Sequence, residues 1–552
     1  MTFKQSETAL YNKSLTIMKH ASVSNMMKRS ASTNLFPDCH VGNTENEAKA
    51  AKKHKVQRYS TVDKAGLADV DLEHIQSILS TEATSKKQSA YDAHAEVEQR
   101  KLEDKISKMK EEICQIELEN RKCNFMTTNR QNDIKKRVQL IESDLENSRN
   151  LSNVWFCVDM DSFYCSCEAV GNPALVGKPF VVSNSLIIST SSYEARKFGV
   201  RSGMPLFQAK LLCPELIVIP VNMEKYKKVS AITQKIFAEY DPFFTSHSLD
   251  EALLNLTPFL VQKSIGGDVA KNTEMIENCA KEIQNRVLQA THCTCSIGVA
   301  PNSSLAKIAS NINKPNGIFQ LQPNKETILE FSHKLAIRKV SGIGPVDEAI
   351  LQNAFNITTV ADLYHQRHIL FQVLKNERKV TNYINAALGF PHSPSSPAIS
   401  AENRKPQNSF SRERTSLVSN VQEAITIGRK LTEEVVCDVE ESHKNHHDVK
   451  VRTITLKIDD TSFHTRSTSA PLKDPIPLKL DSIWKEVKQL IEQEFCKISK
   501  TRLIGLKLSN LTYLAESCPP ENSIAKFFLP STSSTRTPYP RKRKIDEKPK
   551  DI

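Results

Sequence analysis

Residues 154–164 read Val-Trp-Phe-Cys-Val-Asp-Met-Asp-Ser-Phe-Tyr, and this stretch decides the fold. Its first five residues are apolar and predict a buried strand, which ends on Asp159 and Asp161. A carboxylate at such a place is costly to bury unless a cation or a set of hydrogen bonds compensates its charge. From here to about Gln322, strand-like and helix-like segments alternate, which indicates a mixed α/β unit around this strand.

A second acidic pair, Asp250-Glu251, precedes an apolar run at residues 252–254. Mg²⁺ prefers carboxylate oxygens combined with substrate phosphates, and two such ions can activate a hydroxyl and stabilise a departing pyrophosphate. The acids are therefore candidates for a phosphoryl-transfer site. For any one acid taken alone, a turn cap or a pairing with a surface lysine is the more common role, so the surrounding motifs have to decide.

The chain is long enough for several domains, and changes in composition mark their limits. Residues 1–60 are polar and without periodicity, which predicts disorder. Residues 61–152 carry two amphipathic stripes that predict long helices, with a coiled-coil partner helix as the alternative. The stripes consist of Leu102, Ile106, Met109, Ile113 and Ile116, and of Ile134, Val138, Ile141 and Leu145. We divide the chain into residues 1–60, 61–152, 153–324, 325–402, 403–516 and 517–552.

The segments after the α/β unit differ in their apolar periodicity and composition. Residues 325–402 predict small helices, and residues 421–436 predict an amphipathic helix. At residues 453–458 apolar and polar side chains alternate, which predicts a strand with one packed and one solvent-facing side. Residues 501–508 predict a partner strand. Residues 517–552 are rich in Pro, Ser, Thr and basic side chains and predict a disordered tail.

The composition is that of an ordinary folded protein, with 39% hydrophobic and 25% charged residues. The formal net charge of +12 suits a polyanionic partner, although many proteins of this size are equally basic. Neither a long apolar run nor a secretory signal occurs, so we expect no membrane span. None of the 13 cysteines forms a C-x-x-C pair, which argues against structural zinc and for reduced thiols inside the cell.

Five motifs occur in a fixed order around the acids. They are Asp-Met-Asp-Ser-Phe-Tyr at 159–164, Ser-Thr-Ser-Ser-Tyr-Glu-Ala-Arg at 189–196, Ser-Leu-Asp-Glu-Ala at 248–252, Ser-Ile-Gly-Val-Ala-Pro-Asn at 296–302 and Asn-Lys-Pro-Asn-Gly at 313–317. The set resembles the Y-family DNA polymerases, specifically their DinB/kappa branch, over roughly residues 150–515. Residues 63–67, Asp-Lys-Ala-Gly-Leu, and residues 145–153 resemble the N-terminal clasp of eukaryotic members of that branch.

The resemblance implies an α+β multidomain right hand with a palm, fingers, a helix-hairpin-helix thumb, a little finger and an N-terminal helical clasp. The fingers would span about 162–222, the thumb 325–402, the little finger 403–516 and the clasp 61–152. It also implies two Mg²⁺ ions, which Mn²⁺ can replace. The catalytic and metal-binding positions would be Asp159, Asp250 and Glu251, with the Met160 carbonyl as a further ligand and Asp161 in support.

Deoxynucleoside triphosphate (dNTP) binding is implied at Phe163, Tyr164, Thr190, Tyr193, Arg196 and Lys314. Tyr164 takes the position of a steric gate that excludes a ribose 2′-hydroxyl. Phe163 beside it has packing in the core as an alternative role. Arg196 can clamp a phosphate through two hydrogen bonds, whereas Lys314 acts as a point charge.

Contacts with primer-template DNA are implied at Gly342, Gly344, Arg414, Arg452, Lys457 and Lys507. The turn that holds the two glycines resembles the thumb hairpin, whose backbone N–H groups contact phosphates. The basic side chains would give salt-dependent affinity, with ordinary solvated charges as the alternative. Lys457 lies on the solvent side of its predicted strand, whereas Arg452 has the opposite parity unless a bulge intervenes.

The tail carries two short motifs. Ile524, Phe527 and Phe528 resemble a sliding-clamp (PCNA) binding box, with Glu521 where Gln is usual. Residues 541–544, Arg-Lys-Arg-Lys, are compatible with nuclear import. We therefore expect a nuclear monomer with a sliding clamp as a partner.

The implied function is template-directed, error-prone DNA synthesis across lesions. Such an enzyme adds dNTPs to a primer 3′ end opposite or beyond damaged bases and does not proofread. Two alternatives stay open: a related transferase, such as a deoxycytidyl transferase or an RNA-incorporating polymerase, and a non-catalytic scaffold. Tyr164 argues against ribonucleotides, and the intact acids Asp159, Asp250 and Glu251 argue against the scaffold.

Overall fold

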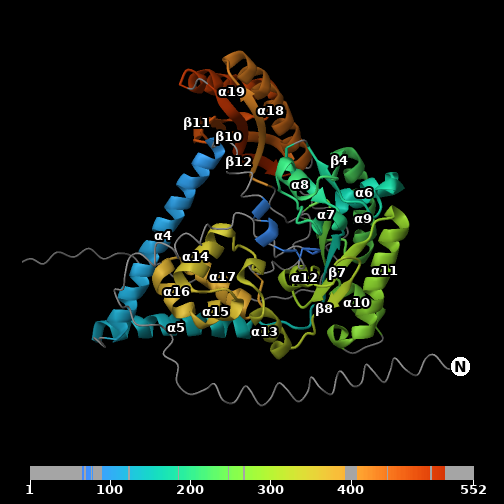
Figure 1. Cartoon of the computed structure of the whole chain (residues 1–552), viewed down its shortest axis with the longest axis vertical. Coiled ribbons are helices and arrows are strands. Elements are labelled where there is room, and N and C mark those ends of the chain that lie inside the picture. The colour runs from blue at the N-terminus through green and yellow to red at the C-terminus, as the bar shows by residue number, and fades with distance from the viewer. Residues whose placement is uncertain are drawn as a thin grey trace, which may run out of the picture. The chain divides into compact units, whose positions relative to one another are not determined.

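A computed structural model of the chain describes residues 65–515, apart from 68–69, 72, 76, 79–89, 122–124, 185, 247, 265–267, 392–406, 444–445 and 498–499 (Figure 1). The two segments predicted to be disordered, the clamp-binding motif and the basic cluster lie outside these residues. In the part that the structure describes, no helix is long and apolar enough to cross a membrane. The cysteines that it describes are free thiols.

The strand predicted from the opening stretch is β1 (Trp155–Met160), the central strand of a five-stranded sheet in the order β5-β6-β1-β7-β8. It runs antiparallel to both neighbours, and its register places Asp159 opposite Glu251 on one side and Ser296 on the other. The register thus brings the two acidic motifs together. The other strands are β5 (Thr245–Ser246), β6 (Glu251–Asn255), β7 (Cys295–Ala300) and β8 (Ile318–Gln320).

Helices cover both faces of this sheet. Phe156 and Val158 belong to a core that includes residues of two long helices, whereas Cys157 packs with residues of a short helix on the opposite face. This alternation is that of a strand buried on both sides. The long helices are α9 (Met223–Tyr240) and α11 (Thr273–Thr291), the short one is α12 (Ser303–Ala309), and α10 (Thr257–Lys263) follows β6.

Gly298 on β7 allows α12 to lie directly against the sheet. A Cβ atom at this position would come within 2.1 Å of the Ser310 backbone nitrogen and 2.2 Å of the Ala306 carbonyl oxygen. Only a residue without a side chain tolerates such a close backbone approach. The consequence is functional, because α12 carries Lys307 beside the acids of β1 and β6.

The chain between β1 and α9 folds around a three-stranded sheet in the order β3-β2-β4. It lies within the residues predicted as fingers. Its core contains Val181, Ala195 and Met204 and is joined by Ile75 from the N-terminal region. The elements are α6 (Phe163–Gly171), β2 (Phe180–Ser183), β3 (Ile188–Ser191), α7 (Tyr193–Arg196), α8 (Leu206–Leu212) and β4 (Ile217–Pro220), with a 3₁₀ turn at Pro173–Leu175.

The predicted N-terminal helices are α4 (Ala90–Arg121) and α5 (Phe125–Asn147). Both helices lie beside the small helices that follow β8 (Figure 1), and both apolar stripes pack into the core of those helices. Helices within the residues predicted as thumb, and not a coiled-coil partner, therefore cover the stripes. The small helices are α13 (Lys325–His333), α14 (Pro345–Phe355), α15 (Val360–His365), α16 (Arg367–Leu374) and α17 (Glu377–Ala387), with 3₁₀ turns at Val269–Lys271 in the palm and Ile337–Lys339 here.

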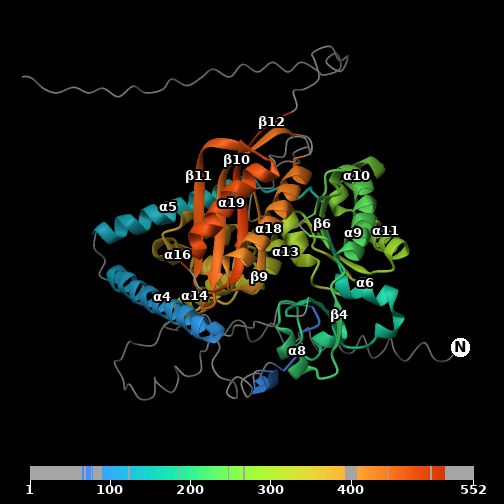
Figure 2. The same cartoon turned by 90° about the horizontal axis from the view of Figure 1, so that it is seen from above.

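The C-terminal unit is a four-stranded sheet in the order β11-β10-β12-β9, with two helices on one face (Figure 2). The predicted strand pair is confirmed, since Thr455 lies opposite Lys507 and Ile454 opposite Leu508. Alternating residues such as Ile454 and Leu456 are buried under the helices. The elements are β9 (Ser409–Val418), α18 (Val421–Ser442), β10 (His446–Asp460), β11 (Thr465–Pro477), α19 (Leu480–Phe495) and β12 (Thr501–Ala515).

Candidate active site

Asp159 and Glu251 converge on one ammonium group. Lys307 Nζ lies 2.7 Å from Asp159 Oδ2 and 2.7 Å from Glu251 Oε2. A second ammonium, that of Lys314, pairs with Asp159 Oδ1. Two acids from neighbouring strands and two lysines from the following segments thus form one compact charge cluster. The carboxylates of this cluster therefore bind closely spaced cationic groups.

The charge state of the cluster follows from these contacts. The Asp159 side chain is 12% exposed, and burial alone would raise the pKa of its carboxyl. Lys314 and Lys307 outweigh the burial and hold the pKa of Asp159 below its usual value. Burial would lower the pKa of Lys307, but Asp159 and the other nearby acids outweigh it and raise that pKa. Asp159 and Lys307 are therefore both charged at neutral pH.

Asp161 plays a different role from Asp159, although only one residue separates them. Its carboxylate accepts hydrogen bonds from Thr294 Oγ1 (2.9 Å), Ser296 Oγ (2.8 Å) and the backbone nitrogen of Asn316 (2.8 Å). Asp161 is 2% exposed, and three donors satisfy its charge without a cation. The residue connects β1, β7 and the Lys314 loop, which fits the supporting role predicted for it.

Asp250 lies at the same end of the sheet but makes a local contact, because its Oδ1 accepts from Ser248 Oγ at 2.6 Å. Its carbonyl accepts from the Met160 nitrogen at 2.8 Å. Among the residues that the structure describes, no three His, Cys, Asp or Glu side chains converge as ligands of one metal ion. Asp159 and Glu251 nonetheless offer carboxylate oxygens to one shared cation, and this donor chemistry fits Mg²⁺.

Tyr164, the predicted steric gate, lies on α6 directly after the acids. Its ring stacks on Tyr226 of α9, with centroids 4.1 Å apart and planes inclined by 10°. The Tyr226 hydroxyl donates a hydrogen bond to Glu168 at 2.8 Å, and this bond holds the Tyr226 ring of the stacked pair in place. Burial and then the charge of Asp250 raise the pKa of Tyr164. Phe163 is 2% exposed within the palm core, which favours its core role over nucleotide contact.

Thr190, Tyr193 and Arg196 occupy one corner of the fingers, on β3 and α7. The Arg196 guanidinium lies over the Tyr193 ring, 4.5 Å from its centroid. It donates from Nη2 to Ser162 Oγ (3.0 Å) and from Nη1 to the Ala65 carbonyl oxygen (2.7 Å). Burial raises the pKa of Tyr193 to about 12, so its hydroxyl stays protonated. This corner offers cationic and hydroxyl donors to an anion.

The predicted glycine turn lies between the Ile337–Lys339 turn and α14. Gly342 is exposed and has a positive φ of 90°, a conformation that favours glycine. Gly344 precedes the first turn of α14, and a Cβ there would meet nothing within 4 Å. The space beside Gly344 is therefore open. Helix N-termini attract anions through their free N–H groups, but Pro345 has no N–H and Asp347 and Glu348 add negative charge to the first turn of this helix.

The face of the C-terminal sheet that lies opposite α18 and α19 is rich in small hydroxyl side chains and carries two lysines. Lys457 pairs with Glu413 (3.0 Å), and Lys507 is exposed. Arg452 is exposed as well. The register of β10 and β11 shifts between Val451 and Thr453, and this is the kind of irregularity that the sequence required for Arg452 to reach the solvent. The residues of this face include Ser411, Glu413, Thr453, Thr455, Lys457, Ser467, Ser469, Gly505, Lys507 and Ser509.

Arg414 lies on the other face of that sheet. Its guanidinium pairs with Glu434 of α18 at 2.8 Å, and its partner across the sheet is the buried Ile504. A DNA contact predicted for Arg414 on the same surface as Lys457 and Lys507 does not agree with this placement. The sequence around Arg414 did not show the difference, since residues 411–416 are polar on both faces of β9.

Two residues of the site were missed from the sequence. Lys307 was overlooked because a lysine in a short helix is usually solvated. The signal was present, however, since Lys307 is the only charged residue of α12, which otherwise consists of small and apolar side chains. Tyr226 belongs to a long amphipathic helix, and nothing in its local pattern distinguishes a stacking partner of Tyr164 from a core residue.

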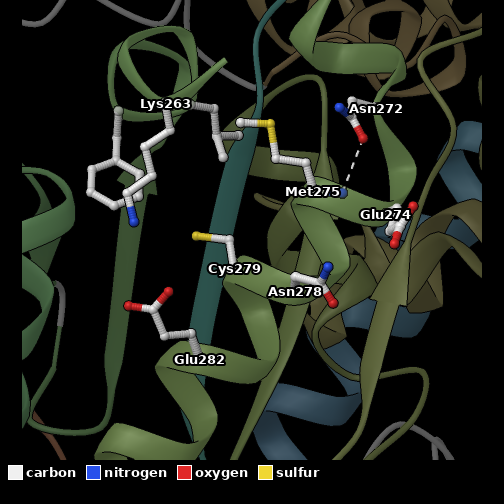
Figure 3. A pocket seen from close by; sticks show the side chains of 9 residues that line it. Lys263, Asn272, Glu274, Met275, Asn278, Cys279 and Glu282 are labelled. Atoms are coloured by element: carbon white, nitrogen blue, oxygen red, sulfur yellow. Dashed lines mark hydrogen bonds between the residues drawn. The ribbon is translucent and has the colours of Figure 1, made fainter. Parts of the chain in front are cut away.

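A separate hollow of about 430 Å³ lies between α10 and α11 (Figure 3). It is lined by Lys263, Met275, Cys279 and Glu282 among others, and the Lys263 ammonium lies 4.4 Å from the centroid of the Phe259 ring. None of the predicted site residues lines it. The hollow is therefore distinct from the acidic cluster on β1 and β6.

The acids lie at one end of a mixed sheet in which all strand pairs except β7 and β8 are antiparallel. Together with an adjacent fingers unit that offers hydrogen-bond donors to a phosphate and a helical thumb, this arrangement defines the class of right-hand polymerases. Two family models match the chain: the impB/mucB/samB family over residues 158–311, and the C-terminal domain of that family over residues 407–521. A solved Y-family DNA polymerase chimera is similar with a TM-score of 0.55 and 25% identity, covering 65% of this chain and 99% of that one.

Curated relatives narrow the class. DNA polymerase kappa of Caenorhabditis elegans is 33% identical, with 84% of this chain and 81% of that protein covered. DNA polymerase kappa of Arabidopsis thaliana is 34% identical, with 87% and 66% covered, and that of Homo sapiens is 31% identical, with 81% and 57% covered. The chain belongs to the Y-family of DNA polymerases, in the branch of DNA polymerase kappa. It spans 57–66% of the length of the human and Arabidopsis relatives.

Proposed function

We propose that the chain is a template-directed, error-prone DNA polymerase that adds dNTPs to a primer 3′ end opposite or beyond damaged bases. The observation that carries the proposal is the convergence of Asp159 and Glu251 on one cationic centre at 2.7 Å each. Phosphoryl transfer depends on such charge neutralisation and on positioning more than on covalent chemistry. The membership in the Y-family supports the same reaction.

Membership in this family implies divalent metal ions, and the carboxylates of Asp159 and Glu251 are suitable ligands for such ions. We propose that Asp159, Glu251 and Asp250 hold two Mg²⁺ ions, together with the Met160 carbonyl, and that Mn²⁺ can replace them. The ions would activate the primer hydroxyl and neutralise the triphosphate. Asp250 would have to exchange its contact with Ser248 for this role. Asp161 keeps β1, β7 and the Lys314 loop in register beneath the site.

Tyr164 would select deoxyribose. Its ring is held by Tyr226 and cannot swing away without loss of the stack. Thr190, Tyr193, Arg196 and Lys314 would contact the triphosphate, whose charge suits the two cations and the protonated Tyr193 hydroxyl.

Substitution Tyr164→Ala should therefore relax the selection of sugar. We expect ribonucleotide incorporation relative to deoxynucleotide incorporation to rise about 100-fold, because a steric clash worth ~2.7 kcal/mol disappears. Single-nucleotide extension with matched rNTP and dNTP measures this ratio. Tyr226→Phe is the control, since it keeps the stacking ring. An unchanged ratio in Tyr164→Ala would show that the ring does not face the sugar.

DNA would lie against the thumb turn and the hydroxyl-rich face of the little finger. The open turn at Gly342 and Gly344 presents backbone N–H groups, and Arg452, Lys457 and Lys507 present positive charge. Such contacts bind phosphates without reading sequence.

We also propose that the chain has the domain limits predicted from the sequence and that it is a nuclear monomer. Its tail would bind a sliding clamp through Ile524, Phe527 and Phe528.

Primer extension by the purified chain tests the proposal. Template-directed addition of the complementary dNTP, dependent on Mg²⁺, is the expected result. Tight binding to primed DNA without any extension would overturn it in favour of a scaffold, and preferential dCMP addition opposite every template base would indicate a deoxycytidyl transferase.

A further inference from the structure

A short N-terminal stretch contacts the fingers at the arginine proposed to bind triphosphate. The Ala65 carbonyl oxygen accepts a hydrogen bond from Arg196 Nη1 at 2.7 Å, while Nη2 donates to Ser162 Oγ at 3.0 Å. The guanidinium also lies over the Tyr193 ring. Ala65, Ser162 and Tyr193 thus hold the Arg196 side chain in place. Ala65 lies more than a hundred residues before Arg196 in the chain.

Gly66 makes the close approach possible. It has a positive φ of 85°, and a Cβ atom there would lie 3.0 Å from Tyr193 Cδ1 and 3.4 Å from Arg196 Cδ. A side chain at this position would be strained by its backbone conformation and crowded by the Tyr193 ring. The turn at Ala65 and Gly66 is thus shaped to bring one carbonyl oxygen onto Arg196.

The stretch is anchored to the fingers a few residues later. Ile75 is 7% exposed and packs in the fingers core with Ala195 and Val200. It lies so close to Gly199 that a Cβ there would meet Ile75 Cδ1 at 2.2 Å. Figures 1 and 2 both show the blue N-terminal piece beside α8. The contact with Arg196 therefore belongs to a docked element.

We propose that the turn at Ala65 and Gly66, anchored by Ile75, acts as a positioning element, in which the Ala65 carbonyl holds Arg196 in the orientation that receives the triphosphate. The inference rests on the proposed function. A guanidinium has five donors, so one hydrogen bond to Ala65 and one to Ser162 leave others to clamp a phosphate. Orientation before binding removes the cost of ordering a long side chain when the nucleotide arrives.

Gly66→Val tests the proposal. The KM for dNTP should rise about tenfold, because a hydrogen bond to a charged group is lost from the nucleotide-free enzyme. The affinity for primed DNA should stay within about twofold, since a side chain at position 66 would meet Tyr193 and Arg196 of the nucleotide corner. Ile75→Asp removes the anchor and should act in the same direction. Glu73→Ala, an exposed substitution in the same stretch, should change neither quantity.

A double-mutant cycle separates positioning from general damage. In an Arg196→Ala background, Gly66→Val should cost no further kcat/KM, because the turn acts through Arg196. An equal tenfold loss in that background would overturn the proposal, and so would a lowered KM in Gly66→Val, which would mean that the turn competes with the triphosphate. If the native chain extends primers and Gly66→Val matches it, only this inference fails. If the native chain extends none, the proposed function fails and this inference with it.

Discussion

Asp159→Asn should lower the rate of primer extension about 1000-fold at saturating Mg²⁺ and dNTP. The substitution removes one negative charge from a site where two ammonium groups and Glu251 meet. If Asp159 holds a metal ion as proposed, its loss raises the barrier by about 4 kcal/mol, which corresponds to that factor. Single-turnover extension measures the rate, and the Kd for primed DNA should stay unchanged.

The matched control is Asp241→Asn. Asp241 is a second buried palm aspartate, but its Oδ2 accepts from the Asn255 nitrogen at 2.8 Å, at the far end of β6. We expect it to lower stability and to change the extension rate less than tenfold. Equal rate losses in the two variants would mean that Asp159 supports the sheet and not the chemistry.

Asp161→Ala should destabilise the palm by about 3–5 kcal/mol. The change leaves the hydroxyls of Thr294 and Ser296 and the Asn316 nitrogen without their acceptor in a buried place. Because a chain of several domains does not unfold in one step, hydrogen exchange at the amides of β1 and β7 is the appropriate measurement. Their protection should fall while that of β10 stays constant.

Asp144→Ala, an exposed substitution on α5, serves as the comparison and should leave all protection factors nearly unchanged. If Asp161→Ala gave the same result, the three hydrogen bonds would contribute little, and the difference between Asp159 and Asp161 drawn above would not hold.

Much of the fold could be predicted from local pattern. The apolar run of β1 is buried on both faces, as a continuous run predicts. The two N-terminal stripes and the alternation in β10 each bury the side that their periodicity indicates. Periodicity reports which side of an element is buried, but it does not name what covers that side. This is why the packing of α4 and α5 on the thumb, and not on a coiled-coil partner, appeared only in the structure.

The site was predictable to the extent that its residues lie in contiguous motifs. Asp159 and Glu251 were found in this way, and antiparallel register joins them. Lys307, Tyr226 and Ala65 act through long-range contacts that no local spacing reveals. Arg414 shows the converse limit, because a strand that is polar on both faces gives no sign of which face meets a neighbouring helix.

The most direct test of the central claim is Mg²⁺-dependent primer extension by the purified chain beside its Asp250→Ala/Glu251→Ala variant, with each dNTP offered singly. We expect template-directed addition by the native chain and its loss in the variant, with retained binding to primed DNA. Extension of equal rate by both proteins would contradict the assignment of these acids, and extension by neither would mean that the charge cluster is structural.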